Sequence, residues 1–123
     1  MAEYIIQENV GLAAPTRRVM TDEEVISQLA HHIVFSASAL EIPADGTPVI
    51  IRLQLSSLPL SDDTRAPIRE SIPVKVIADG EPMPLQLDAN GYSEFECAFA
   101  AAGDYHFTTD GVVYSDGLTI KAV

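Results

Sequence analysis

Three histidines are the side chains of this 123-residue chain that come closest to forming a metal site. His31 and His32 are adjacent, so they diverge at the end of a helix and face opposite sides in a strand. His106 lies far along the chain, and no cysteine or carboxylate completes a zinc-like spacing with any of the three. The histidines are therefore predicted to be surface or helix-capping residues, and no metal site is expected.

The only cysteine, Cys97, does not have the sequence surroundings of a reactive thiol. It alternates with Phe95 and Phe99, and no lysine, arginine or histidine lies close in sequence. A reactive thiol needs exposure and a neighbouring cation. Cys97 is therefore predicted to be a small buried hydrophobic residue, and a single cysteine excludes a disulfide within the chain.

The sequence contains no other recognisable catalytic or ligand-binding motif. No serine lies in a nucleophile elbow, and no glycine-rich phosphate loop precedes a helix. The segment Asp88-Ala89-Asn90-Gly91 lacks the alternating ligands and distal glutamate of an EF-hand loop, so turn formation explains its aspartate better than calcium binding. The sequence thus predicts a protein that is not an enzyme, with no catalytic residue and no cofactor.

The charge of the chain argues against two classes of partner. The chain has 18 acidic and 7 basic residues, a formal net charge of −11, and no dense basic cluster. This excess repels the phosphates of nucleic acids and the surface of anionic membranes. The 47% content of hydrophobic residues is typical of one globular domain. No signal peptide or membrane span is expected, because the apolar runs are short and no positive segment precedes one.

A short helix is the first regular element that the sequence predicts. Thr21 and Glu24 have the spacing of a capping box, in which each side chain accepts a hydrogen bond from the backbone N–H of the other residue. Met20 and Val25 occupy the positions of a hydrophobic staple. We expect a helix over about residues 22–31, which is too short to persist unless it packs on something.

From residue 32 onward the pattern is typical of short β-strands. Asn90-Gly91 is the strongest hairpin signal, because a type I′ turn needs positive φ at both central residues, and period-two alternation flanks it. Replacing Gly91 with valine is expected to cost more than about 1 kcal/mol. A long irregular connection is expected over residues 56–71. The strands are expected near residues 33–42 (one strand or two short ones), 49–55, 74–76, 83–87, 93–99, 105–107 and 118–122.

These strands, with glycine-containing turns at short intervals, predict an all-β fold that is a β-sandwich or a small barrel. Pro73, Pro82 and Pro84 lack a backbone N–H and are expected at strand starts or sheet edges. We expect this domain to span residues 32–123, preceded by an arm and the helix over residues 1–31. The predicted core consists of Val49, Ile51, Leu53, Leu55, Val74, Val76, Leu85, Leu87, Phe95, Phe99 and Leu118.

Several short motifs resemble the bacterial immunoglobulin-like domains that occur in invasin-type adhesins and in virion proteins of tailed phages. In that family an alanine-aspartate-glycine turn precedes the second strand, and a glycine-x-tyrosine segment enters a late strand. The resemblance covers residues 33–123 and implies an immunoglobulin-like β-sandwich of about seven strands. The 56–71 segment and the lack of tandem copies depart from the family. The matching residues are Ile42-Pro43-Ala44-Asp45-Gly46, 49–53, Pro73-Val74-Lys75-Val76, 87–92 and Ala102-Gly103-Asp104-Tyr105.

Residues 1–20 are predicted to be an arm that docks on a neighbouring protein. Gly11 and Pro15 are expected to interrupt any regular element here, and a frayed terminus is the alternative. A disordered tail would be poor in tyrosine and isoleucine, and two of the seven basic residues lie in this segment. The predicted partner-binding residues are Tyr4, Ile5, Ile6, Val10, Leu12, Arg17 and Arg18.

Two functions of different classes remain open from the sequence. A lone immunoglobulin-like domain with a docking arm resembles a phage accessory component, which implies a virion structural protein assembled in the host cytoplasm. The resemblance favours a capsid decoration (cement) protein, repeated as a homo-oligomer on a symmetric shell and bound to the major capsid protein or another virion subunit. A tail or neck accessory protein is the nearest variant. The alternative is a carbohydrate- or receptor-binding module that uses Tyr92 and Tyr114 at one end of the sandwich.

Overall fold

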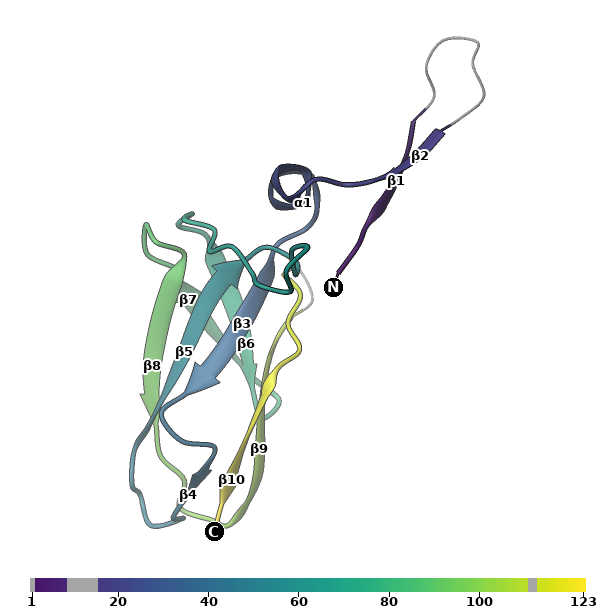
Figure 1. Cartoon of the computed structure of the whole chain (residues 1–123). Helices are drawn as coiled ribbons and strands as arrows, with labels where there is room; N and C mark the ends of the chain where they lie inside the picture. The colour runs from purple at the N-terminus through teal and green to yellow at the C-terminus, as the bar shows by residue number, and fades with distance from the viewer. Residues whose placement is uncertain (1, 9–15, 111–112) are drawn as a thin grey trace.

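The protein is built mostly of β-strands, with one short helix between an N-terminal hairpin and a β-sandwich (Figure 1). The computed structural model describes residues 2–8, 16–110 and 113–123. The hairpin consists of β1 (Ile5–Glu8) and β2 (Thr16–Val19), and the helix is α1 (Asp22–Gln28). The predicted all-β class with one short helix is confirmed.

The sandwich consists of a three-stranded and a five-stranded sheet. The first has the order β3-β5-β8 and is antiparallel. The second has the order β4-β10-β9-β6-β7 and is antiparallel except between β4 and β10. Residues 33–42, predicted as one strand or two short ones, form the two strands β3 and β4, which belong to different sheets. The bounds are β3 His32–Ala37, β4 Glu41–Ile42, β5 Val49–Ser56, β6 Pro73–Ala78, β7 Glu81–Gln86, β8 Tyr92–Cys97, β9 Gly103–Thr109 and β10 Leu118–Ala122.

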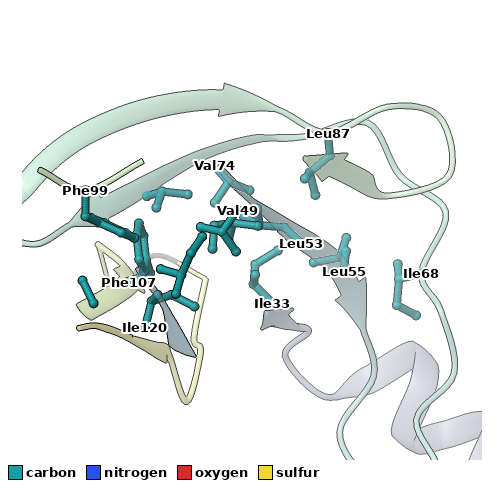
Figure 2. Close-up of a cluster of buried hydrophobic side chains, with 14 residues drawn as sticks. Ile33, Val49, Leu53, Leu55, Ile68, Val74, Leu87, Phe99, Phe107 and Ile120 are labelled. Atoms are coloured by element: carbon teal, nitrogen blue, oxygen red, sulfur yellow. The ribbon is translucent and has the colours of Figure 1, made fainter. Parts of the chain in front are cut away.

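The core lies between the two sheets and extends over the length of the sandwich (Figure 2). Alternation along β5 directs every second side chain inward, and each buried side chain of this size contributes about 1.5–3 kcal/mol. Eight of the eleven predicted core residues are buried. The other three, Leu85, Phe95 and Leu118, are half-buried against the cluster. The eight are Val49, Ile51, Leu53, Leu55, Val74, Val76, Leu87 and Phe99.

The Tyr105 side chain fastens β9 to the loop that precedes it. Its hydroxyl donates a 2.7 Å hydrogen bond to the backbone carbonyl of Ala101, four residues upstream. Its ring stacks on Phe99 with centroids 4.1 Å apart. Together these contacts fix the connection between β8 of the three-stranded sheet and β9 of the five-stranded sheet. This connection includes Ala102-Gly103-Asp104-Tyr105, one of the segments on which the resemblance rests.

The hairpin predicted around Asn90-Gly91 is wrong, although a turn is present. β7 pairs with β6 and β8 pairs with β5, so this turn connects the two sheets instead of two paired strands. The Gly91 N–H donates to the Asp88 carbonyl at 3.0 Å, and φ is positive at Gly91 but not at Asn90. The Asp88 carboxylate accepts from the N–H groups of Asn90 and Tyr92. The segment is therefore an aspartate-stabilised turn and not a type I′ hairpin.

A two-residue hairpin occurs instead at Asp79 and Gly80, between β6 and β7. Both residues have positive φ, +49° and +88°, which are the signs that a type I′ turn requires. The hairpin places β7 at the edge of the five-stranded sheet. Pro82 and Pro84 lie in this edge strand and Pro73 begins β6, so the predicted placement of the prolines is confirmed.

The segment over residues 56–71 is irregular, as predicted, and it is attached to the core. Ile68 is buried in the main cluster, and its N–H donates to the Leu55 carbonyl at 2.8 Å. Ser57 is fully buried, and its hydroxyl accepts a hydrogen bond from the Ala66 N–H. These contacts make the segment a part of the sandwich and not a free loop.

Helix α1 packs on the same end of the sandwich. The capping box of Thr21 and Glu24 is present as predicted, and Val25 is buried. Ile26 contacts the core cluster, while the Asp22 carboxylate accepts from the backbone N–H and the hydroxyl of Ser61. The helix ends at Gln28 and not at residue 31. Its packing surface is this chain's own sandwich and 56–71 segment.

Candidate functional site

The N-terminal arm is a β-hairpin, which corrects the prediction that it has no regular element. β1 and β2 pair antiparallel, and the Met20 N–H extends the ladder by donating to the Tyr4 carbonyl at 2.7 Å. Gly11 and Pro15 lie between the two strands in sequence and therefore interrupt neither. Val10 and Leu12, two of the predicted partner-binding residues, lie outside the described residues.

One face of the hairpin exposes an apolar pair. Ile5 and Val19 are directly opposite each other in the register, so their side chains lie on the same face. Ile5 is 60% exposed and Val19 is 47% exposed. Gln7 and Arg17 form the next pair on this face, and both are exposed. Ile5, Val19 and Arg17 are called the hairpin face below.

The opposite face of the hairpin turns toward the helix. Met20 is buried, and Tyr4 and Ile6 are half-buried. Arg18 makes a bidentate ion pair with the Glu24 carboxylate, with nitrogen–oxygen distances of 2.6 and 2.7 Å. The Arg18 hydrogen bond, aided by bonds from Thr21, lowers the pKa of Glu24 from 4.5 to about 2. Arg18 thus links the hairpin to the first turn of α1 through Glu24.

Replacing Arg18 with glutamine should raise the pKa of Glu24 from about 2 toward 4.5. The pKa should remain below 4.5, because the Thr21 bonds persist. In the unchanged chain the folded pKa lies below the unfolded one, so the ion pair stabilises fully above pH 4.5 and loses its effect as the pH falls toward 2. Carboxyl ¹³C NMR titration of both chains measures the shift, and an unchanged Glu24 pKa would contradict the assignment.

The partner-binding prediction thus divides by face. Ile5 and Arg17 are exposed together on the hairpin face, whereas Tyr4, Ile6 and Arg18 lie on the face toward α1. Val19 belongs with Ile5 but was missed from the sequence. Val19 lies beside Ile5 because β1 pairs with β2. Alternation within a single strand does not reveal this pairing.

The residues considered for chemistry are dispersed. The His31 ring lies 3.0 Å from the Ile26 carbonyl near the end of α1, and His106 contacts the Thr119 hydroxyl on the five-stranded sheet. Cys97 is half-buried against the core, and burial raises the pKa of its thiol. Over residues 2–8, 16–110 and 113–123, no group of three His, Cys, Asp or Glu side chains is arranged to hold a metal. His31 therefore lies at the end of the helix, where the sequence allowed either a surface or a capping histidine.

The two tyrosines proposed for ligand binding do not form one platform. Tyr92 begins β8, whereas Tyr114 bridges to His32 on the far side of β3, so β5 and β3 lie between them. The Tyr92 hydroxyl donates to Glu94 at 2.6 Å, which raises the pKa of Tyr92. The exposed Tyr114 ring leans on the His32 ring, with centroids 5.8 Å apart.

Neither the search for membrane-spanning helices nor the comparison with known proteins assigns a function to this chain. In the part of the chain that the structure describes, no helix has the length and apolarity needed to cross a bilayer. No protein-family model, curated protein or solved structure matches this chain.

Proposed function

We propose that this protein is a structural, non-enzymatic docking module that attaches to another protein subunit through its hairpin face. The observation that carries the proposal is the exposed pair of Ile5 and Val19 on a hairpin that Arg18 holds against α1. The resemblance described above favours a specific form of this function, a virion decoration protein that binds the major capsid protein or another virion subunit.

The position of the hairpin suits attachment. It extends away from the sandwich beyond α1, so a partner can cover it without contacting the sheets (Figure 1). The hairpin face also carries the exposed Arg17, whereas the chain as a whole has a net charge of −11. A partner surface with an apolar centre and an acidic margin would complement this face, while the acidic remainder of the molecule faces solvent.

The expected affinity of one copy is modest. Ile5 is 60% and Val19 is 47% exposed, so burying this remaining surface would stabilise a complex by about 1.5–3 kcal/mol before the cost of association. The Arg18–Glu24 pair reduces that cost, because the hairpin is already ordered on the helix. Stable attachment then depends on repetition, since many copies on a symmetric particle gain from avidity.

The test replaces Ile5 and Val19 with aspartate in the full-length protein. The double variant should no longer co-sediment with virions that contain the proposed partner subunit, because two carboxylates would replace the apolar centre of the contact. Leu40→Asp is the matched control, since Leu40 is as exposed as Ile5, at 60%, but lies on the sandwich. An I5D/V19D protein that is folded and co-sediments as well as the unchanged chain would overturn the proposal.

A further inference from the structure

A groove of about 320 Å³ opens between the two sheets on the side where β7 and β8 are the edge strands. Its wall is mostly apolar and includes residues at the end of β8. This end of β8 points away from the hairpin (Figure 1). Phe99 and Phe107 mark this end of the core in Figure 2. The apolar wall consists of Met83, Phe95, Cys97, Phe99, Tyr105 and Phe107.

The β8 edge of the groove has backbone groups available for another strand. The Leu55 N–H donates to the Gly91 carbonyl, so every second residue from Gly91 bonds to β5 and the others point away from it. Of those others, Tyr92 is bonded to Asp88. The outward N–H and C=O groups of Glu94 and Glu96 have no partner among the residues that the structure describes.

The β7 edge of the groove cannot accept a strand in the same way. The Leu87 N–H donates to the Ile72 carbonyl, so the odd-numbered residues bond to β6 and the even-numbered ones point outward. Two of the outward positions are Pro82 and Pro84, which have no N–H. Only β8 can therefore direct the pairing of an added strand.

The charges around the groove select the composition of that strand. Glu94 and Glu96 project from β8 on the solvent side, while Asp79 and Glu81 lie at the groove rim, and all four are exposed. Phe95, between the two glutamates, points toward the groove. A strand added beside β8 would alternate in the same way, with one set of side chains in the apolar groove and the other beside the glutamates.

We infer that the groove between β7 and β8 binds an extended segment of a partner protein, in which apolar residues alternate with lysine or arginine. The segment pairs with the backbone of Glu94 and Glu96, inserts its apolar side chains over Phe95 and Met83, and places its cations beside the glutamates. This mode is β-strand addition, in which backbone bonds give affinity and alternate side chains give specificity. The site is separate from the hairpin face and does not depend on the function proposed for that face.

Cys97 offers a direct readout, because it is the only thiol of the chain and lines the groove. The probe is a synthetic peptide of about ten residues that alternates valine and lysine, with blocked ends. The alkylation rate of Cys97 in the full-length protein should fall as this peptide is added. A peptide that alternates serine and lysine has the same charge and should protect Cys97 poorly, since it cannot fill the apolar groove.

Two variants at Glu96 separate the backbone from the charge. Glu96→Gln keeps the outward N–H and should weaken peptide binding only a few-fold, because an exposed ion pair contributes little. Glu96→Pro removes the N–H and should weaken binding by a further factor of about ten. A second measurement uses the unchanged chain and a peptide that is N-methylated on its pairing edge. This peptide should protect Cys97 less well, with a loss of binding similar to that caused by Glu96→Pro.

Several outcomes would overturn the inference. Equal protection of Cys97 by the valine and serine peptides would show that charge alone attracts them. Full protection by the N-methylated peptide would exclude strand pairing. Protection that needs no peptide and increases with protein concentration would identify the occupant as a second copy of this chain.

Discussion

Replacing Gly91 with valine should destabilise the protein by about 3 kcal/mol or more, which places it among the most damaging single substitutions in the chain. Gly91 has a φ of +70°, a conformation that a β-branched residue adopts only with strain. A Cβ atom at this position would lie 2.0 Å from the Ile68 carbonyl oxygen and 3.2 Å from the Leu55 side chain. The Ile68 carbonyl belongs to the backbone and Leu55 lies in the core, so neither neighbour can move away to accommodate a side chain at position 91.

Gly46→Val is the matched control for this prediction. Gly46 also has positive φ, +87°, but a Cβ atom there would meet nothing within 4 Å. It should therefore show the cost of the backbone strain alone, about 1–2 kcal/mol. Urea denaturation of both variants measures the difference. Equal losses of unfolding free energy would show that the Gly91 turn does not press against Ile68.

The contrast between Gly91 and Asp79 shows where local sequence patterns are sufficient and where they are not. Alternation predicted each strand around these turns, because burial of one face leaves a period-two signal. It did not predict which strands pair. Asn90-Gly91 connects different sheets and Asp79-Gly80 closes a hairpin, and this difference depends on contacts with distant strands that the turn residues do not encode.

The core could be predicted from alternation within single strands, whereas the groove depends on how strands from different sheets are placed. Ile51 and Leu53 lie in the most regular alternating segment, and both are fully buried. The groove requires Met83 and Phe95 to face each other across two sheets, which follows from topology and not from either strand alone. The role of Pro82 became clear only once β7 was known to be the edge that borders this groove.

The arm was recognised by composition, but its form was not. Tyr4 and Ile5 indicated a segment with surface to bury, while the glycine and proline between the strands were interpreted as interruptions. The decisive residues are Arg18 and Glu24, which lie six positions apart and form an ion pair. A capping box explained Glu24 completely at the level of the sequence, so a second role for its carboxylate was not apparent.

Replacing Ile68 with alanine should destabilise the protein by about 2–4 kcal/mol. The 56–71 segment has no strand of its own, and the buried Ile68 side chain is its main apolar attachment to the core. The loss would include both the transfer of the missing methyl and methylene groups and the cavity left beside Leu55. Ile50→Ala is the matched control, because Ile50 is 36% exposed on the outer face of β5, and it should cost less than about 1 kcal/mol.

Limited trypsin digestion tests whether the loss is concentrated in the segment. Arg65 and Arg69 flank Ile68, and the Arg65 guanidinium donates to the Ser57 carbonyl at 3.1 Å in the folded chain. When Ile68 no longer holds the segment, local opening should expose both arginines, because cleavage follows the population of the open state. Cleavage at Arg65 and Arg69 should therefore accelerate in Ile68→Ala under conditions where the sheets remain intact. If the two arginines are cleaved no faster than in Ile50→Ala, the attachment lies elsewhere, in the hydrogen bonds of Ser57 and of the Ile68 backbone.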